Sequence, residues 1–321
     1  MKVLLSIVAG KLCLIEFAFS CNGNIEGVNV RKICPNFAAT QTRRTIMIFK
    51  YLKESFARKK ARRVFSEYPI KVSNYQLADE GTIQFGNWMN PLTGEKVITQ
   101  SEVDFFKRFI PKGSLAIDIG GNTGDTTVPM GLAAGKEGLV LGFDPNPHVF
   151  KVLENNAGLN KDKTNIVALP YAISDEDGEF YYGSSEASYS NGGISAEADK
   201  KHGNFTLSQK VRGVNLQQYL EKNYGSWLDK LSFIKIDTEG YDKEIVKSIA
   251  GLIVKYKPVI ISEVFTQLTK EERNELYDVI ADKGYDLFYF ADFDSKAETK
   301  PIQRADMTNW THFNLYALPK K

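Results

Sequence analysis

The 321-residue sequence predicts an α/β fold: an open, mostly parallel, seven-stranded sheet with helices on both faces. Short apolar runs alternate with helix-compatible stretches over about 200 residues, which is typical of parallel sheets connected by helices. Apolar residues make up 43% of the chain and charged residues 25%, so the composition allows a sizeable buried core.

The individual elements follow from apolar patterning and from Gly and Pro positions. Residues 101–110 form an amphipathic pattern that Pro111 and Gly113 end, which predicts a short helix. The runs predicted as strands are 115–119, 138–143, 165–169, 233–236, 259–263, 285–290 and 313–318, and the predicted helices are 123–134, 149–160, 243–255 and 270–283. No clear helix separates the last two strands, so we expect antiparallel neighbours at one edge.

The domain organisation follows from the same patterns. Residues 1–70 are interpreted as an N-terminal helical extension with a long helix over 40–66, and residues 71–321 as the α/β domain. Residues 70–98 carry turn-rich, strand-like pieces that predict a hairpin leading into this domain. Residues 178–214 have loop composition between two strand-like pieces, which predicts an inserted β-hairpin with a long tip. This tip is either a substrate-binding lid or a surface loop without a role.

The N-terminal residues bear on localisation. Cys13, Cys21 and Cys34 are the chain's three cysteines, so no disulfide framework is expected in the main body. Lys11 and Glu16 interrupt the apolar start, which favours a packed or mobile extension over a secretory signal. We therefore expect a cytoplasmic protein.

Charge restricts the expected partners. The net charge of +2 gives no reason to expect a nucleic-acid partner. Residues 43–63 hold nine basic residues and one acid, Glu54. We favour a solvated helix face over contact with an anionic membrane, because both faces mix charged and apolar residues. The N-terminal helices could also form a homo-oligomer contact.

A glycine-rich turn follows the first predicted strand. Asp118 ends the strand, and Gly120, Gly121 and Gly124 come directly after it. Ligands of open parallel sheets bind at the carboxyl ends of the strands. Glycines there allow unusual backbone angles and remove side chains from the path of a ligand. The turn therefore predicts a binding site.

A second acidic strand end supports a nucleoside ligand. Asp144 closes the second strand, where a carboxylate can accept hydrogen bonds from both hydroxyls of a ribose, and Pro145 stiffens the following turn. A nicotinamide cofactor would favour Gly-x-Gly-x-x-Gly, but Asn122 stands where the second glycine would be. An acid before the glycines suits a ligand with a cationic amino-acid end, such as S-adenosyl-L-methionine.

Several motifs together resemble the FkbM-type methyltransferases. They are DIGGNTG (118–124), FDPNP (143–147), FIKIDTEG (233–240) and PVIISE (258–263), and the similarity covers about residues 80–318. The resemblance implies a Rossmann-like fold, S-adenosylmethionine as cofactor and methylation of hydroxyl groups on sugars, lipopolysaccharide or polyketide-type products. Family members often have an aspartate before the fourth strand, where this chain has Gln217, and residues 1–70 lie outside the resemblance.

Fold position suggests further roles. The backbone groups of Ala172 and Ile173, after the third strand, are expected to meet the adenine edge. Asp237 and Glu239 follow the fourth strand, and in extended chain both would face the pocket. We expect Asp237 to contact the ligands near the transferred methyl group or the acceptor. We expect Glu239 to orient Asp237. Alternatively, Glu239 only caps the next helix.

Two residues at the far side of the sheet complete the candidate site. Glu263 ends the fifth strand and is interpreted as a substrate contact, and His312 opens the last strand as a candidate base. Asp237 and Glu263 alone do not make a convincing metal site, so none is predicted. An NAD-dependent oxidoreductase and a non-catalytic module that binds a partner through its basic helix remain the alternatives.

Overall fold

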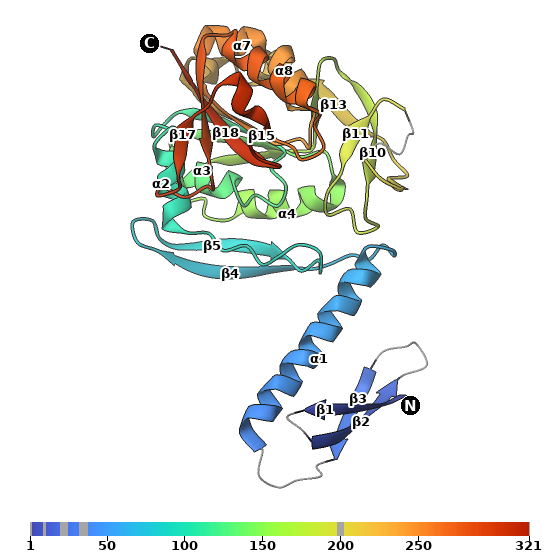
Figure 1. Cartoon of the computed structure of the whole chain (residues 1–321). Coiled ribbons are helices and arrows are strands. Elements are labelled where there is room, and N and C mark those ends of the chain that lie inside the picture. Colours follow the sequence, from blue (N-terminus) through green and yellow to red (C-terminus); the bar gives the residue numbers. More distant parts are fainter. Residues whose placement is uncertain (1, 9–10, 20–24, 32–37, 198–201, 321) are drawn as a thin grey trace. The chain divides into compact units, whose positions relative to one another are not determined.

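A computed structural model describes residues 2–8, 11–19, 25–31, 38–197 and 202–320 (Figure 1). The chain divides into two compact units, residues 1–57 and residues 58–321. Each unit is described by itself below.

The first unit begins with three strands. They form an antiparallel sheet in the order β1 (Lys2–Val8), β2 (Lys11–Phe19) and β3 (Ile25–Arg31). The prediction of a helical extension is therefore incomplete, because only helix α1 (Ala38–Ala61) matches the predicted helix over 40–66. The segment KLCLIEFAF of β2 contains Ile15, Phe17 and Phe19, residue types that favour a strand. Cys13 lies in β2, whereas Cys21 and Cys34 lie outside the described residues.

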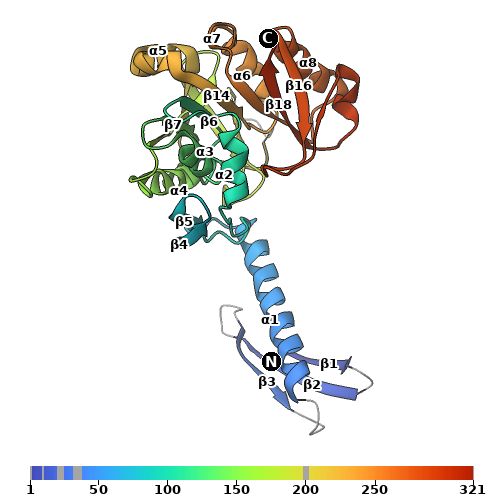
Figure 2. The ribbon, with the colours of Figure 1, turned by 90° about the vertical axis from the view of Figure 1, so that its left-hand side faces the viewer.

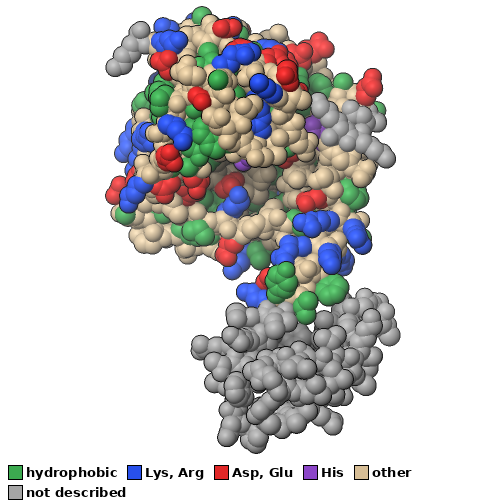
Figure 3. Space-filling model, in the orientation of Figure 1, with side chains coloured by type: hydrophobic (Ala, Val, Ile, Leu, Met, Phe, Trp, Pro, Cys, Tyr) green, Lys and Arg blue, Asp and Glu red, His purple; other side chains and the backbone are tan. Residues whose placement is uncertain are grey.

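Helix α1 has a basic C-terminal end. Arg58, Lys59 and Lys60 occupy its last turn, where positive charge interacts favourably with the helix dipole. Figure 3 shows Lys and Arg side chains gathered over this end. Within the part of the chain that the structure describes, every helix is too short or too polar to span a lipid bilayer.

The second unit is built on an eight-stranded mixed sheet with the order β17-β16-β18-β15-β14-β6-β7-β8. The strands are β6 (Leu115–Ile119), β7 (Leu139–Phe143), β8 (Ile166–Leu169), β14 (Leu231–Ile236), β15 (Val259–Val264), β16 (Tyr285–Phe290), β17 (Thr299–Pro301) and β18 (Phe313–Pro319). The seven predicted strands are all present, and β17 is a short additional strand at the edge. Strand β18 pairs antiparallel with both β15 and β16, which confirms the predicted antiparallel edge.

Helices cover both faces of this sheet (Figures 1 and 2). They are α2 (Gln100–Lys107), α3 (Thr127–Ala134), α4 (Pro147–Gly158), α5 (Leu216–Tyr224), α6 (Asp242–Ser248), α7 (Ala250–Tyr256) and α8 (Lys270–Ala281), with 3₁₀ turns at Gly225–Lys230 and Arg304–Thr308. The helix predicted over 243–255 is divided at Ile249, which leaves helical geometry with φ −105° and ψ 16°. The strand alternation decides which helices each face meets: Leu115 and Ile117 share a core with α5–α8, and Ala116 shares a core with α2 and α3.

Two β elements flank the main sheet. The predicted hairpin over 70–98 contains strands β4 (Ile70–Leu77) and β5 (Gly81–Trp88). The predicted insertion over 178–214 contains an antiparallel pair, β10 (Gly178–Ser184) and β13 (Val211–Asn215). Strand β9 (Ala172–Ser174) pairs with β13, while β11 (Gly193–Ser195) and β12 (Phe205–Thr206) pair with β10.

Helix α4 connects the first of these elements to the glycine turn. The amide of the buried Asn156 donates to the carbonyls of Gly86 in β5 and of Thr123 in the turn, and its oxygen accepts the N–H of Gly86 at 2.6 Å. One side chain therefore holds hairpin, helix and turn together.

Gly120 is required by the backbone itself. Its φ is +77°, and a Cβ at this position would lie 1.9 Å from the carbonyl oxygen of Asp237. The glycine therefore permits the close approach of two strand ends, a role that the sequence analysis assigned to the ligand instead.

We predict that Gly120→Ala lowers the free energy of unfolding more than Gly81→Ala, as measured by urea denaturation. Gly81 has a similar φ of +69° but open space around its Cβ, so only the left-handed conformation opposes alanine there, at about 1–2 kcal/mol. Gly120→Ala adds a clash, which typically costs about 1–3 kcal/mol more. Equal destabilisation by both substitutions would contradict the steric argument.

Candidate active site

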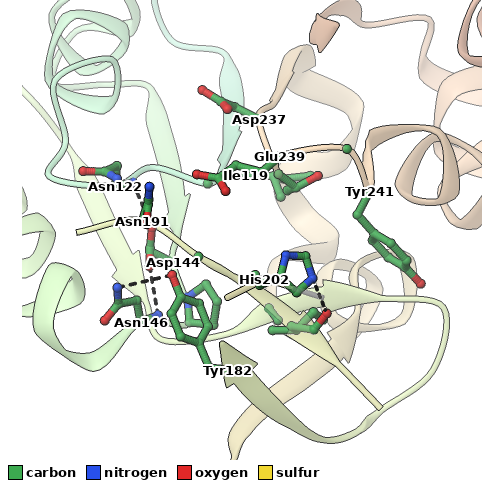
Figure 4. Close-up of a pocket in the computed structure, with 18 of the residues that line it drawn as sticks. Ile119, Asn122, Asp144, Asn146, Tyr182, Asn191, His202, Asp237, Glu239 and Tyr241 are labelled. Carbon is green, nitrogen blue, oxygen red and sulfur yellow. Dashed lines mark hydrogen bonds between the residues drawn. The ribbon is translucent and has the colours of Figure 1, made fainter. Parts of the chain in front are cut away.

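The carboxyl ends of β6, β7 and β14 open into a cavity of about 610 Å³. The predicted site residues that line it are Gly120, Asn122, Asp144, Pro145, Ala172, Ile173, Asp237 and Glu239. Figure 4 shows Asn122, Asp237 and Glu239 along one side of this cavity, and Asn146, Tyr182 and His202 along the other. The structure therefore brings together most of the residues that the sequence motifs indicated.

Asp144 is held in place by backbone groups. Its two carboxylate oxygens accept the N–H of Asn122 at 3.0 Å and the N–H of Asn146 at 2.9 Å. Burial raises the pKa of Asp144 to about 7, although both hydrogen bonds oppose this shift. Each oxygen keeps a further lone pair for a hydroxyl donor.

Asp118 does not line the cavity. Its side chain is fully buried and accepts hydrogen bonds from the hydroxyls of Thr126 at 2.9 Å and Thr127 at 2.6 Å, and from Lys235 at 3.2 Å. The expected contact between Asp118 and a ligand amine therefore lacks the required access. A strand-end position in the sequence does not reveal that the strand's α2/α3 face is closed at this point.

Gly121 and Gly124 also lie outside the cavity lining. A Cβ at either position would approach the side chain of Leu153 in α4 to 3.3 Å. These glycines therefore let the turn pack closely against α4.

Lys235 is a central residue that the sequence analysis missed. It is the penultimate residue of β14 and is only 2% exposed. Its Nζ donates to Asp118 at 3.2 Å and to Asp237 at 3.1 Å. Burial alone lowers the pKa of Lys235, but the two carboxylates outweigh this effect and raise it. A lysine within an apolar strand that ends in an aspartate, as in FIKID, was the available signal.

Asp237 and Glu239 both line the cavity, although the chain turns between them. Glu239 adopts φ 52°, so the extended geometry assumed for the pair is wrong. Burial, followed by the charge of Asp237, raises the pKa of Glu239 to about 7, and a hydrogen bond from the N–H of Gly192 opposes the shift. The side chain of Asp237 is 41% exposed, so it is accessible to a ligand.

Glu263 and His312 interact with each other outside the cavity lining. The Nε2 of His312 lies 2.7 Å from Oε1 of Glu263, while the buried Oε2 of Glu263 has no hydrogen-bond partner among the described residues. Burial and the nearby carboxylates of Asp237 and Asp242 raise the pKa of Glu263. The structure therefore pairs these two predicted residues but does not bring them to the cavity surface.

The insertion supplies a wall that the motifs did not indicate in detail. Tyr182, Asn191, Gly192 and His202 line the cavity, and the amide of Asn146 donates to the hydroxyl of Tyr182 at 3.3 Å. Because these residues face the cavity, the insertion takes part in the site.

The comparison with protein families decides the family. The model of the methyltransferase FkbM domain matches residues 118–287, which is more than half of the chain and includes every residue that lines the cavity. This chain belongs to the FkbM methyltransferase family. S-adenosylmethionine is the cofactor, and the chain is a methyltransferase.

Several solved structures are similar to this family member. A precorrin-6y C5,15-methyltransferase from Geobacter metallireducens is 10% identical, with a TM-score of 0.39, over 71% of this chain and 93% of its own. Methyltransferase FkbM from Methylobacillus flagellatus is 12% identical, with a TM-score of 0.37, over 68% of this chain and 51% of its own. None of the curated proteins matches the chain.

The chemistry of the cavity fits S-adenosylmethionine, which carries a sulfonium and an ammonium group. Asp144, Asp237, Glu239 and Glu272 contribute carboxylates to the lining, whereas the described lining residues include neither Lys nor Arg. Such a lining suits a cationic ligand and gives a diphosphate no counter-charge. The dinucleotide alternative therefore loses support on electrostatic grounds as well.

We predict that Lys235→Met lowers the free energy of unfolding by about 3–5 kcal/mol, because it leaves Asp118 buried without its counter-ion. Lys247→Met is the control, since Lys247 lies 2.5 Å from Glu275 but is 42% exposed, and such pairs contribute about 0–1 kcal/mol. Urea denaturation measures both. Adding Asp118→Asn to Lys235→Met should restore part of the loss, and a purely additive double variant would argue against the pairing.

Proposed function

We propose that the chain is an S-adenosylmethionine-dependent O-methyltransferase that acts on a hydroxyl group of a sugar, polysaccharide or secondary metabolite. One observation supports the proposal most directly. The accessible carboxylate of Asp237 lines the cavity at the carboxyl ends of β6, β7 and β14, which we call the cofactor cavity, and it forms an ion pair with the buried Lys235. A hydroxyl must lose its proton as it attacks, so a base within hydrogen-bond reach assists the reaction, and a carboxylate can serve as that base.

The chain's residues divide the work of binding. The carboxylate of Asp144 receives the ribose hydroxyls, and the backbone of Ala172 and Ile173 meets the adenine edge. The carboxylates of Asp237 and Glu239 favour the cationic end of the cofactor. Tyr182, Asn191 and His202 of the insertion form part of the wall around the bound cofactor.

Methyl transfer is an in-line displacement. The bound cofactor supplies an activated methyl group on its sulfonium. When the cofactor is bound, the acceptor oxygen would take this methyl group in exchange for the sulfur, which would leave as neutral S-adenosylhomocysteine, and Asp237 would accept the hydroxyl proton. The ion pair with Lys235 keeps the Asp237 carboxylate oriented toward the cavity. Glu239 contributes to this orientation through its negative charge.

We predict that affinity for S-adenosylmethionine falls about tenfold between pH 8 and pH 6, measured by isothermal titration calorimetry. Ribose hydroxyls need the ionised carboxylate of Asp144, whose pKa is about 7, so the competent fraction is lost as the pH falls through 7. Asp144→Asn should bind weakly and lose the part of this dependence that comes from ribose binding. Glu239 also has a pKa of about 7 and is assigned to the cationic end of the cofactor, so Glu239→Gln should lose only its own part and the double variant should lose the dependence altogether. An unchanged pH dependence in Asp144→Asn would remove Asp144 from ribose binding.

We predict that Asp237→Asn lowers turnover by about 10²–10⁴-fold, because the acceptor proton loses its base. The measurement is transfer of label from methyl-labelled S-adenosylmethionine to a panel of hydroxyl compounds, with cofactor affinity determined separately. Glu239→Gln is expected to reduce turnover much less. Full turnover in Asp237→Asn would exclude Asp237 from the mechanism.

Exclusion of nucleic acid, the cytoplasmic location, the absence of membrane contact and the homo-oligomer contact stay predictions. Among the solved structures compared, one from Clostridium thermocellum is described as a putative rRNA methylase, at 11% identity and a TM-score of 0.37. RNA fragments therefore belong in the acceptor panel.

A further inference from the structure

A second cavity of about 600 Å³ borders the cofactor cavity. The two cavities have three lining residues in common, Gly120, Asn122 and Asp237. Asp237 is the one carboxylate among the described residues that lines both. The proposed base therefore stands at the junction between two spaces of similar size.

The two cavities differ in which parts of the chain build them. The lining of the cofactor cavity lies wholly between residues 119 and 272, within the segment that matches the family. Most of the second cavity comes from residues 87–106, 292–293 and 314, which lie outside that segment. A part of the site that is built by flanking segments is the part expected to differ between enzymes that share a cofactor.

The charges in the second cavity argue against an anionic ligand. Its two described lysines are both paired: Lys96 lies 2.5 Å from Asp125, and Lys235 binds the carboxylates of Asp118 and Asp237. Glu102 and Asp292 add two further carboxylates to the lining. Carboxylates accept hydrogen bonds from hydroxyls, whereas a phosphate or carboxylate ligand would meet repulsion here.

Three aromatic side chains complete the cavity wall, one of them Phe106 of α2. Trp88 ends strand β5 and Phe293 follows strand β16, and both line the cavity. Phe293 is held by the rings of Phe105 and Phe106, whose centroids each lie 5.5 Å from its own. Aromatic surface together with a few placed polar groups is the usual chemistry of a small-molecule site. The apolar face of a sugar ring can lie against such a surface while its hydroxyls reach the carboxylates.

We propose that this second cavity is the acceptor site, and that it takes a neutral, polyhydroxylated ring such as an unphosphorylated sugar. The inference rests on the proposed function, because it assumes a hydroxyl acceptor for the methyl group. In-line displacement requires the acceptor to approach opposite the leaving sulfur. Two cavities that meet at Asp237 provide this arrangement, with the base beside the transferred carbon.

Gly94 offers a way to fill the second cavity without straining the fold. It lines the cavity, its φ is not in the left-handed region, and a Cβ there would meet nothing within 4 Å. Gly225 has the same open surroundings but lines neither cavity. Gly94→Phe and Gly225→Phe therefore form a matched pair of variant and control.

The probes are neutral methyl glycosides and the corresponding sugar phosphates, added to the full chain with saturating S-adenosylhomocysteine. Saturation-transfer NMR detects their binding, and calorimetry with S-adenosylmethionine tests the cofactor site independently. We expect glycosides to bind and sugar phosphates not to bind. Gly94→Phe should weaken glycoside binding at least about tenfold while its cofactor affinity and that of Gly225→Phe stay within about twofold of the parent.

The outcomes separate this inference from the proposed function. Failure of the parent chain to bind S-adenosylmethionine would overturn the proposed function. If the cofactor binds but no glycoside does, or if sugar phosphates bind in preference, the proposed acceptor class is wrong. Glycoside binding that Gly94→Phe leaves unchanged, or that is detected only when S-adenosylhomocysteine is omitted, would place the acceptor outside the second cavity.

Discussion

The buried contact of Lys235 with Asp118 and Asp237 is the constraint on which the site depends. Lys235 and Asp118 are register partners in the adjacent parallel strands β14 and β6, so their side chains leave the sheet on the same face. Removing a lysine and an aspartate from water is costly unless each is paired, which makes other alignments of these strands unfavourable. The same ammonium group also holds Asp237 at the cavity surface. Strand register and the position of the proposed base are therefore set by one cluster of charges.

The glycine turn is needed because the carboxyl ends of β6 and β14 lie very close together. The N–H of Asp237 donates to the carbonyl of Ile119, and the Asp237 carbonyl lies where a side chain of residue 120 would begin. Gly120 is thus needed so that the ends of β6 and β14 can approach. This approach in turn places Asn122, whose N–H binds Asp144. The turn shapes the cavity mainly by arranging its neighbours rather than by leaving space for a ligand.

Most residues that line the proposed cofactor cavity could be predicted because their motifs are local in the sequence. Asp144 follows a buried strand within a short motif, and the edge of a parallel sheet brings such motifs together. Lys235 could not be assigned in this way, since its partner Asp118 lies 117 residues away and a lysine in an apolar strand has no local explanation. Glu263 and His312 were correctly placed at strand ends. Their mutual contact depends on the register of the antiparallel strands β15 and β18. A one-residue change of this register would move the side chains of one strand to the opposite face of the sheet.

The second cavity shows why acceptor recognition is harder to predict than cofactor binding. Its walls combine the hairpin, helix α2, the glycine turn and the segment after β16, and these elements are far apart in the sequence. Asn156 and the Lys96–Asp125 ion pair bring the hairpin onto the glycine turn, so the hairpin depends on the family core for its position. Sequence changes in the hairpin can therefore alter the second cavity without disturbing Asp144 or the strand register. The two proposed sites share only the lining residues at their junction. Substitutions elsewhere in the second cavity can therefore change acceptor specificity while cofactor binding is retained.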